Sequence, residues 1–129
     1  METLNYRDLG IIVTLPQDIE WLDYQKELLG AASGETLNFK VGSFPSKVGP
    51  GARCYLTHRG YIKGYHIISG FSEKEFVCTT TGKRWTGRFI ERTGRFHYIE
   101  EKIPYKGFQG WRYFNMTVYL ESLREHSPD

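Results

Sequence analysis

The chain has 129 residues, of which 40% are hydrophobic, 25% charged and 16% aromatic, with a formal net charge of +2. This size fits a single domain over residues 1–129 and is enough to bury one core. The start, METLNYRDLG, lacks a basic region followed by an apolar run, and no apolar stretch approaches the ~18 residues of a membrane span. We therefore expect a cytoplasmic protein without a signal peptide or a membrane partner, with Cys54 and Cys78 as free thiols.

Charge is distributed unevenly along the chain. Residues 1–52 hold 4 Lys/Arg and 7 Asp/Glu, residues 53–114 hold 12 and 5, and residues 115–129 hold 1 and 3. The central block, with a net charge of +7, predicts either a basic face or basic residues spread over the solvent side of several strands. The chain also has 9 Tyr, 8 Phe and 3 Trp, more than a small core needs, so we expect some rings at the surface.

The first half of the chain predicts a strand, a helix, a second strand and a loop. Residues 10–15 form an apolar run that is typical of a strand. A capping box that starts at Thr14 predicts a helix over 17–29, with an apolar side for packing and an acidic side for solvent. Residues 35–41 alternate like a strand, and the Gly/Pro/Ser-rich segment 42–51 predicts a loop that is either the lip of a site or a plain surface connection.

The clearest sequence pattern is a hairpin formed by residues 52–58 and 61–71, with Arg59-Gly60 as its two-residue turn. In this register Cys54 pairs with Tyr65 on a core face. A glycine within the second strand predicts a bulge or the close approach of a ligand. The opposite, more polar face is predicted to carry Arg53, Tyr55, Thr57, Gly64 and His66.

The second half predicts more short strands. The expected strands are 75–79, 84–91, 95–99 and 108–114, with a turn at 81–83 after the first of them. Residues 117–126 predict a short C-terminal helix, with a closing strand as the alternative. Many short strands after one helix are typical of a barrel or a strongly curved sheet, so the predicted fold class is α+β, mainly β, as a small pseudo-barrel.

Several kinds of chemistry lack a signature. The chain has no CxxC or HxxxH spacing, and the predicted register turns Cys54 and His66 to opposite faces, which argues against zinc. Motifs for an activated nucleophile or a phosphate loop are also missing. The sequence therefore predicts no metal and no cofactor, and it favours a non-catalytic protein. A hydrolase would have to draw on residues that are otherwise ordinary surface positions: Lys83, Thr86, Glu75 and Glu91.

Residues 83–114 interleave basic and aromatic side chains. Cations neutralise phosphates, and flat rings stack on unpaired bases at about 1–3 kcal/mol per base. The phenylalanines of this segment are expected in the core, whereas Trp85, Trp111 and Tyr113, each next to an arginine, are better candidates for the surface. Together with the hairpin, this segment gives the candidate nucleic-acid-binding residues Arg53, His66, Arg84, Trp85, Arg88, Trp111, Arg112 and Tyr113.

The run GPGARCYLTHRGYIKGYHIISGF, residues 49–71, resembles the central hairpin of PUA-like domains, which include the ASCH, EVE and YTH families. The strand from Ile62 to Ile68 matches their I-x-G-x-x-x-I pattern, although Ala52 stands where an aspartate is usual. The resemblance implies RNA binding, or capture of a modified or flipped base in a cleft beside a barrel. The G-x-K-x-x-E-x-R pattern of ASCH domains is missing, which argues against their amidohydrolase activity.

Three hypotheses follow for the function. The leading one is a module that binds RNA, or single-stranded or modified DNA, through a basic cleft lined by aromatic residues. The second is a small hydrolase of a modified nucleoside. The third is a protein-interaction domain whose basic-aromatic segment is buried against a partner, because Trp, Tyr and Arg are also typical interface anchors. The sequence does not predict an oligomeric state.

Overall fold

A computed structural model describes residues 9–77, 82 and 84–125, without the side chains of Phe76 and Trp85. Cys78, Lys83 and most of the predicted turn at 81–83 lie outside the described residues. Within the described part of the chain, no helix has the length and apolar character needed to cross a bilayer. The elements are β1 (Gly10–Thr14), α1 (Trp21–Ala32), β2 (Leu37–Val41), β3 (Arg53–His58), β4 (Tyr61–Val77), β5 (Arg84–Arg92), β6 (His97–Tyr98), β7 (Trp111–Phe114) and α2 (Met116–Glu125).

The strands form one mixed sheet in the order β2-β5-β4-β3-β1-β7, and β6 pairs with β4. β1 and β3 run parallel, whereas the other named pairs are antiparallel. Among the described residues no ladder joins the edge strands β2 and β7, so the sheet is open. The predicted α+β, mainly β architecture with an N-terminal and a C-terminal helix is confirmed, while the PUA-like pseudo-barrel stays a prediction.

Apolar side chains pack on both faces of the sheet. α1 covers one face, which we call the α1 face, and buries Tyr24, Leu28 and Ala31 there. On the other face, the α2 face, α2 and the segment that precedes β7 cover a second core. Period-two alternation along each strand assigns the side chains to one core or the other. The α1 face carries Ile11, Val13, Cys54, Leu56, Ile68 and Ile90, and the α2 face carries Ile12, Tyr55, Ile62 and Phe114.

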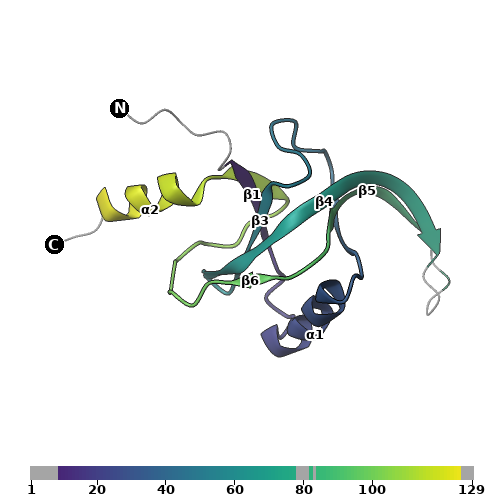
Figure 1. The fold of residues 1–129 in the computed structure, drawn as a ribbon, viewed down its shortest axis with the longest axis horizontal. Helices are drawn as coiled ribbons and strands as arrows, with labels where there is room; N and C mark the ends of the chain where they lie inside the picture. The colour runs from purple at the N-terminus through teal and green to yellow at the C-terminus, as the bar shows by residue number, and fades with distance from the viewer. Residues whose placement is uncertain (1–8, 78–81, 83, 126–129) are drawn as a thin grey trace.

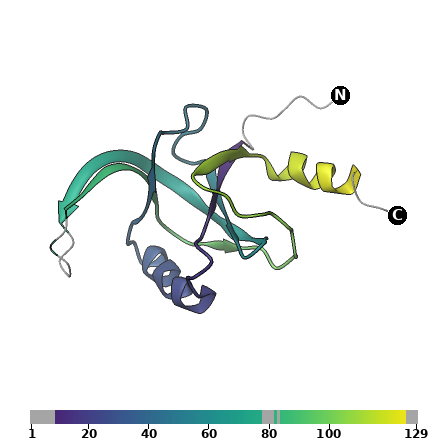
Figure 2. The same ribbon diagram turned by 180° about the vertical axis from the view of Figure 1, so that it is seen from behind.

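β4 and β5 extend beyond the rest of the sheet as a long curved ribbon, which ends on the far side of the molecule from α2 (Figures 1 and 2). The last pair that β2 contributes is Val41 with Arg88. From there the two long strands continue alone to the pair Val77–Arg84. We call this ribbon, residues 73–77 and 84–88, the arm.

The β3–β4 hairpin has the predicted turn but not the predicted register. Arg59 and Gly60 both adopt positive φ, 51° and 89°, as a two-residue turn of this hand requires. The register shifts next to Leu56, which pairs with Gly64 instead of the predicted Lys63. A Cβ on Gly64 would lie 2.2 Å from the carbonyl oxygen of His97, so the absent side chain admits β6.

This bulge corrects the predicted faces of β4. Cys54 pairs with His66 instead of Tyr65, so these two side chains share the α1 face rather than pointing to opposite faces. Tyr65 lies against Tyr55 on the α2 face instead of in a core with Cys54. The predicted bulge at Gly64 is confirmed, but β6 makes the close approach there.

Two other element predictions need correction. α1 begins at Trp21 rather than at residue 17, because Thr14 belongs to β1 and its hydroxyl accepts a hydrogen bond from the Phe108 amide. Glu20 precedes the helix in an extended conformation and pairs with Arg59 at 3.1 Å rather than capping the helix. The predicted strand 75–79 is the distal part of β4, which runs unbroken to Val77.

Candidate functional site

The predicted binding residues divide between the two faces of the sheet. Strand alternation from Ile90 places Arg84 and Arg88 on the α1 face of the arm. Trp111 and Tyr113 lie on the same face of β7. Arg53 and Arg112 lie on the α2 face. The eight predicted residues therefore do not line one cleft, and the side chain of Trp85 lies outside the described part of the structure.

His66 lies in the core instead of on the predicted polar surface, because the bulge turns it inward. Its Nε2 donates to the carbonyl oxygen of Gly94 at 3.1 Å, and Nδ1 has no hydrogen-bond partner among the described residues. Burial, together with the positive charge of Arg92, lowers the pKa of His66 from 6.5 to about 4. The ring is therefore neutral at physiological pH and offers no surface to a ligand.

Trp111 and Tyr113 hold the loop at residues 42–51. The indole Nε1 of Trp111 donates to the carbonyl oxygen of Ser43 at 2.8 Å, and the two rings meet edge-on at 4.8 Å. The Tyr113 hydroxyl accepts a hydrogen bond from the Lys47 amide at 3.0 Å. Burial works to raise the pKa of Tyr113, but hydrogen bonds with Ser46 and Lys47 outweigh it and lower that pKa. Both aromatic residues are half-buried and support the loop.

Arg53 and Arg112 each lie over an aromatic ring on the α2 face. The Arg53 guanidinium is 4.4 Å from the centre of the Tyr65 ring, and Arg112 is 4.1 Å from that of Phe108. The Tyr65 ring also stacks with the His97 ring, with their centres 4.7 Å apart. These cation–π pairs leave the arginines exposed but separate them from the α1 face by the thickness of the sheet.

On the arm, Arg84 and Arg88 pair with acidic residues across the ribbon. Arg84 lies 2.9 Å from Glu75, and Arg88 lies 2.9 Å from Glu73 while also donating to the carbonyl oxygen of Gly42. Thr86 is the cross-strand partner of Glu75. An open groove here is lined by Val41, Gly42, Glu73, Lys74, Glu75, Thr86, Gly87 and Arg88.

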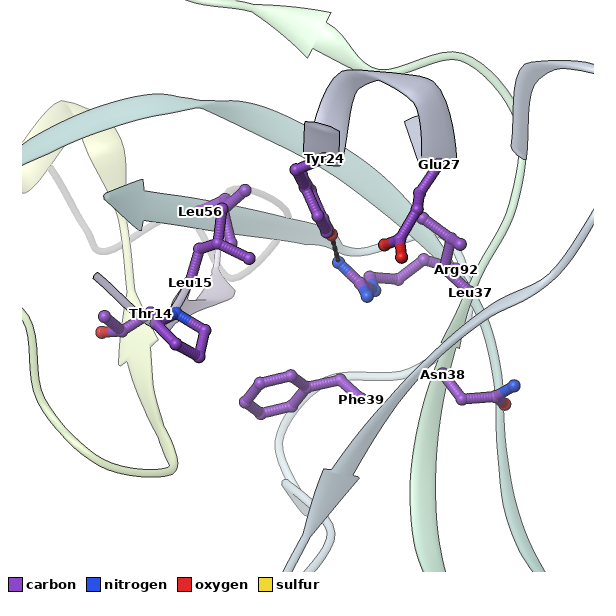
Figure 3. A pocket seen from close by; sticks show the side chains of 10 residues that line it. Thr14, Leu15, Tyr24, Glu27, Leu37, Asn38, Phe39, Leu56 and Arg92 are labelled. Atoms are coloured by element: carbon purple, nitrogen blue, oxygen red, sulfur yellow. Dashed lines mark hydrogen bonds between the residues drawn. The ribbon is translucent and has the colours of Figure 1, made fainter. Parts of the chain in front are cut away.

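A second and more enclosed hollow lies between α1, β2 and the end of β1 (Figure 3). Its volume is about 190 Å³. The pockets of drug-sized ligands have roughly 300–1,000 Å³, so this one has room for a single small ring system. Apolar side chains and a few polar groups line it: Thr14, Leu15, Pro16, Tyr24, Glu27, Leu37, Asn38, Phe39, Leu56 and Arg92.

Arg92, the last residue of β5, supplies the positive charge of this pocket. Its side chain is 5% exposed, and its Nη1 donates to the Tyr24 hydroxyl at 3.2 Å. Tyr24 is the one hydrogen-bond partner of the guanidinium within the described residues, and Nε has none. Burial works to lower the pKa of Arg92, but interactions with Tyr24, Cys54 and Glu27 outweigh it and raise that pKa. The group therefore stays charged.

Glu27 and Phe39 also line the pocket, one as a carboxylate near the Arg92 guanidinium and the other as an aromatic ring. The Glu27 carboxylate, on α1, points toward the Arg92 guanidinium, and the Phe39 ring from β2 lies across the hollow from Tyr24 (Figure 3). A guanidinium donates hydrogen bonds, a carboxylate accepts them, and a ring offers a stacking surface. The arrangement is suited to hold a flat group that has both acceptors and donors on its edge.

Arg92 was not among the residues predicted from the sequence, although a signal for it exists. Arg84 and Arg88 lie in the predicted strand 84–91, and Arg92 follows at the same interval of four residues, directly after its predicted end. Side chains an even number of residues apart share a face of a strand, so three arginines in one row are expected there. The burial of the third cannot be predicted locally, because it depends on α1 packing over the end of β5.

Cys54, whose thiol is free and buried, has its pKa raised to about 11 by burial, which makes it a poor nucleophile. Among the described residues no group of three or more His, Cys, Asp or Glu is placed to hold a metal ion. Comparisons of the chain with protein-family models, curated proteins and solved structures found no match.

Proposed function

We propose that this protein is a cytoplasmic, non-catalytic nucleic-acid-binding domain of the PUA-like kind, which takes one unpaired base of RNA or single-stranded DNA into the pocket beside Arg92. The observation that carries the proposal is a buried guanidinium beside a small pocket, whose Nε has no hydrogen-bond partner among the residues that the structure describes. A buried charge costs several kcal/mol of stability unless it is well paired. Acceptor atoms of a ligand would compensate Arg92.

The remaining surface of the pocket is suited to a base. Leu15 and Leu56 form an apolar wall, and Phe39 provides a ring on which a base can stack. Stacking of this kind contributes about 1–3 kcal/mol per base and depends little on sequence. The volume of about 190 Å³ suits a base with its sugar left outside, as in the capture of a flipped or unpaired nucleotide.

The phosphates next to the captured base would lie over the arm. β2 joins the two hollows, because Leu37 and Phe39 line the pocket and Val41, on the same face of the strand, lines the groove. Arg88 and Arg84 follow along the α1 face. Their ion pairs with glutamates are exposed, and such pairs contribute about 0–1 kcal/mol, so phosphates can compete for these arginines.

The charge of α1 disfavours the opposite path. Asp23 and Glu27 are exposed on this helix and Glu20 lies just before it, while Lys26, the one basic residue of α1, lies 3.8 Å from Asp23. Negative charges at these positions repel a phosphate backbone over distances of about one Debye length, ~8 Å at physiological salt. The proposed strand therefore runs from the pocket away from α1 and along the arm.

The hydrolase hypothesis has less support in the geometry. Thr86 and Glu75 meet on the arm, but in an open groove where the Glu75 carboxylate pairs with Arg84. Lys83 lies outside the described residues. Catalysis of this kind favours an enclosed site that excludes water.

Fluorescence anisotropy tests the proposal with labelled single-stranded RNA, single-stranded DNA and a duplex, titrated at about 50 mM and about 200 mM salt. We expect the single strands to bind more tightly than the duplex, and their affinity to fall as salt rises. The double variant Arg84→Ala/Arg88→Ala should reduce the slope of log K against log salt by about 1.4, since each phosphate contact on a single strand contributes about 0.7.

The matched control is Arg124→Ala, which removes an exposed arginine from α2, far from the arm. Its salt slope should equal that of the unaltered protein. An absence of binding to any single strand, or binding that does not respond to salt, contradicts the proposed function.

A further inference from the structure

The pocket brings its two charged groups together, and each has hydrogen-bonding capacity that none of the described residues uses. Nη1 of Arg92 is engaged by Tyr24, while Nε has no partner in the described part of the chain. Nε and Nη2 form one edge of the planar group, which can donate two parallel hydrogen bonds once the atoms that cover Nε give way to a ligand. The Glu27 carboxylate points toward the same hollow and lies more than an ion-pair distance from Arg92, since no ion pair between them occurs among the described residues.

We propose, resting on the function proposed above, that guanine is the base this pocket selects, with Arg92 donating to its O6 and N7 and Glu27 accepting from its N1–H and 2-amino group. Guanine carries two neighbouring acceptors, which an arginine meets in bidentate fashion. It also carries two neighbouring donors on the adjacent edge, which match the two oxygens of a carboxylate.

The other bases satisfy this pair of groups less well. Adenine has an amino donor beside N7, so the guanidinium finds a single acceptor there. Cytosine offers two neighbouring acceptors but a single donor group, and uracil has one N–H between two carbonyls. Guanine is thus the base on which both Arg92 and Glu27 make two hydrogen bonds, without leaving a buried charge half-satisfied.

The two charged groups differ in how far their replacement would affect the stability of the fold. Glu27 is exposed, so Glu27→Gln keeps the shape of the side chain without disturbing the core. Arg92 is buried and donates a hydrogen bond to Tyr24, so its replacement would change both the stability of the fold and the binding of a ligand. The decisive variant is therefore Glu27→Gln, and Glu121→Gln on the exposed side of α2 is its matched control.

The experiment is a competition in which free nucleosides displace a labelled single-stranded oligonucleotide, combined with calorimetry of each nucleoside alone. Guanosine should compete most strongly. Inosine, which lacks the 2-amino group, and 7-deazaguanosine, which lacks N7, should each bind about tenfold more weakly, or about 1.4 kcal/mol. Glu27→Gln should weaken guanosine about tenfold and abolish its advantage over inosine, while Glu121→Gln should leave both unchanged.

The outcomes distinguish this proposal from the one on which it rests. Equal competition by guanosine, adenosine and cytidine, with oligonucleotide binding intact, overturns guanine selection and leaves the nucleic-acid-binding function standing. An unaltered guanosine–inosine difference in Glu27→Gln overturns the role of Glu27 and hence the proposal. Calorimetric binding of guanosine without any binding of oligonucleotides supports guanine selection by the pocket but contradicts the proposed nucleic-acid-binding function.

Discussion

Arg92 and Tyr24 join β5 to α1 through a buried hydrogen bond, in which Nη1 donates to the phenol oxygen at 3.2 Å. Both side chains are buried, and they line the same pocket as Glu27 and Phe39. A cation is thus held in the core by a neutral partner. The orientation of the guanidinium, and with it the shape of the pocket, depends on this contact.

Tyr24→Phe should therefore destabilise the fold by about 1–3 kcal/mol, because it leaves a buried charged donor without its partner. The free energy of unfolding in urea measures the effect. Tyr98→Phe, at a ring that is 52% exposed, is the control and should change stability by less than about 0.5 kcal/mol. Equal effects of the two substitutions would show that the hydrogen bond to Arg92 contributes nothing.

The glycine at the bulge of β4 gives a second prediction. Gly64→Ala places a Cβ 2.2 Å from the His97 carbonyl oxygen and 2.5 Å from the Phe96 ring, at a φ of 153° that side chains rarely adopt. We expect a loss of more than about 2 kcal/mol, since overpacking and strain add. Gly70→Ala, in the same strand with open space around it, should cost less than about 1 kcal/mol by the same denaturation measurement.

That bulge also explains which parts of the fold could be predicted from the sequence. The hairpin and its Arg59-Gly60 turn follow from local pattern and turn chemistry, and both are confirmed. The inserted residue near Leu56 is set by the packing of β6 on Gly64, a contact between segments more than thirty residues apart. A shift of one residue exchanges the two faces of a strand, so one tertiary contact moved His66 from the predicted surface into the core.

The candidate site was predictable to a similar extent. Alternation along β5 places Arg84 and Arg88 on one face, as the structure describes them. The roles of Trp111 and Tyr113 could not be predicted, because their partners Ser43 and Lys47 come from a loop more than sixty residues away in the sequence. Aromatic side chains next to an arginine are typical of binding surfaces and of loop supports alike.

The buried His66 predicts a dependence of stability on pH. Its pKa is about 4 in the folded protein, whereas a histidine in an unfolded chain titrates near ~6.5. Below about pH 6.5 the unfolded chain binds a proton at this histidine, whereas the folded chain does not until the pH approaches 4. The contribution of neutral His66 to the free energy of unfolding is therefore complete above about pH 6.5 and is lost as the pH falls toward 4. Between about pH 7.5 and about pH 5 the loss should be about 2 kcal/mol.

His66→Gln isolates this contribution, because glutamine keeps a donor for the Gly94 carbonyl oxygen but does not titrate. Urea unfolding at the two pH values should give a smaller difference for the variant than for the unaltered protein. His58, whose pKa is also lowered by burial and by the charge of Arg59, is present in both proteins, so its contribution cancels. Identical pH dependence in the two proteins would contradict the assignment to His66.

The contact between Tyr113 and the loop at 42–51 gives the last prediction. The Tyr113 hydroxyl accepts the hydrogen bond of the Lys47 amide, so Tyr113→Phe leaves that N–H to exchange with solvent. The loss of a hydrogen bond of about 1 kcal/mol corresponds to roughly fivefold faster hydrogen exchange at Lys47, which NMR can follow. The Ala52 amide, which donates to the Gly49 carbonyl oxygen within the same loop, is the internal reference and should not change. If both amides exchange faster, Tyr113 holds the whole loop in place, and if neither does, this hydrogen bond does not restrain it.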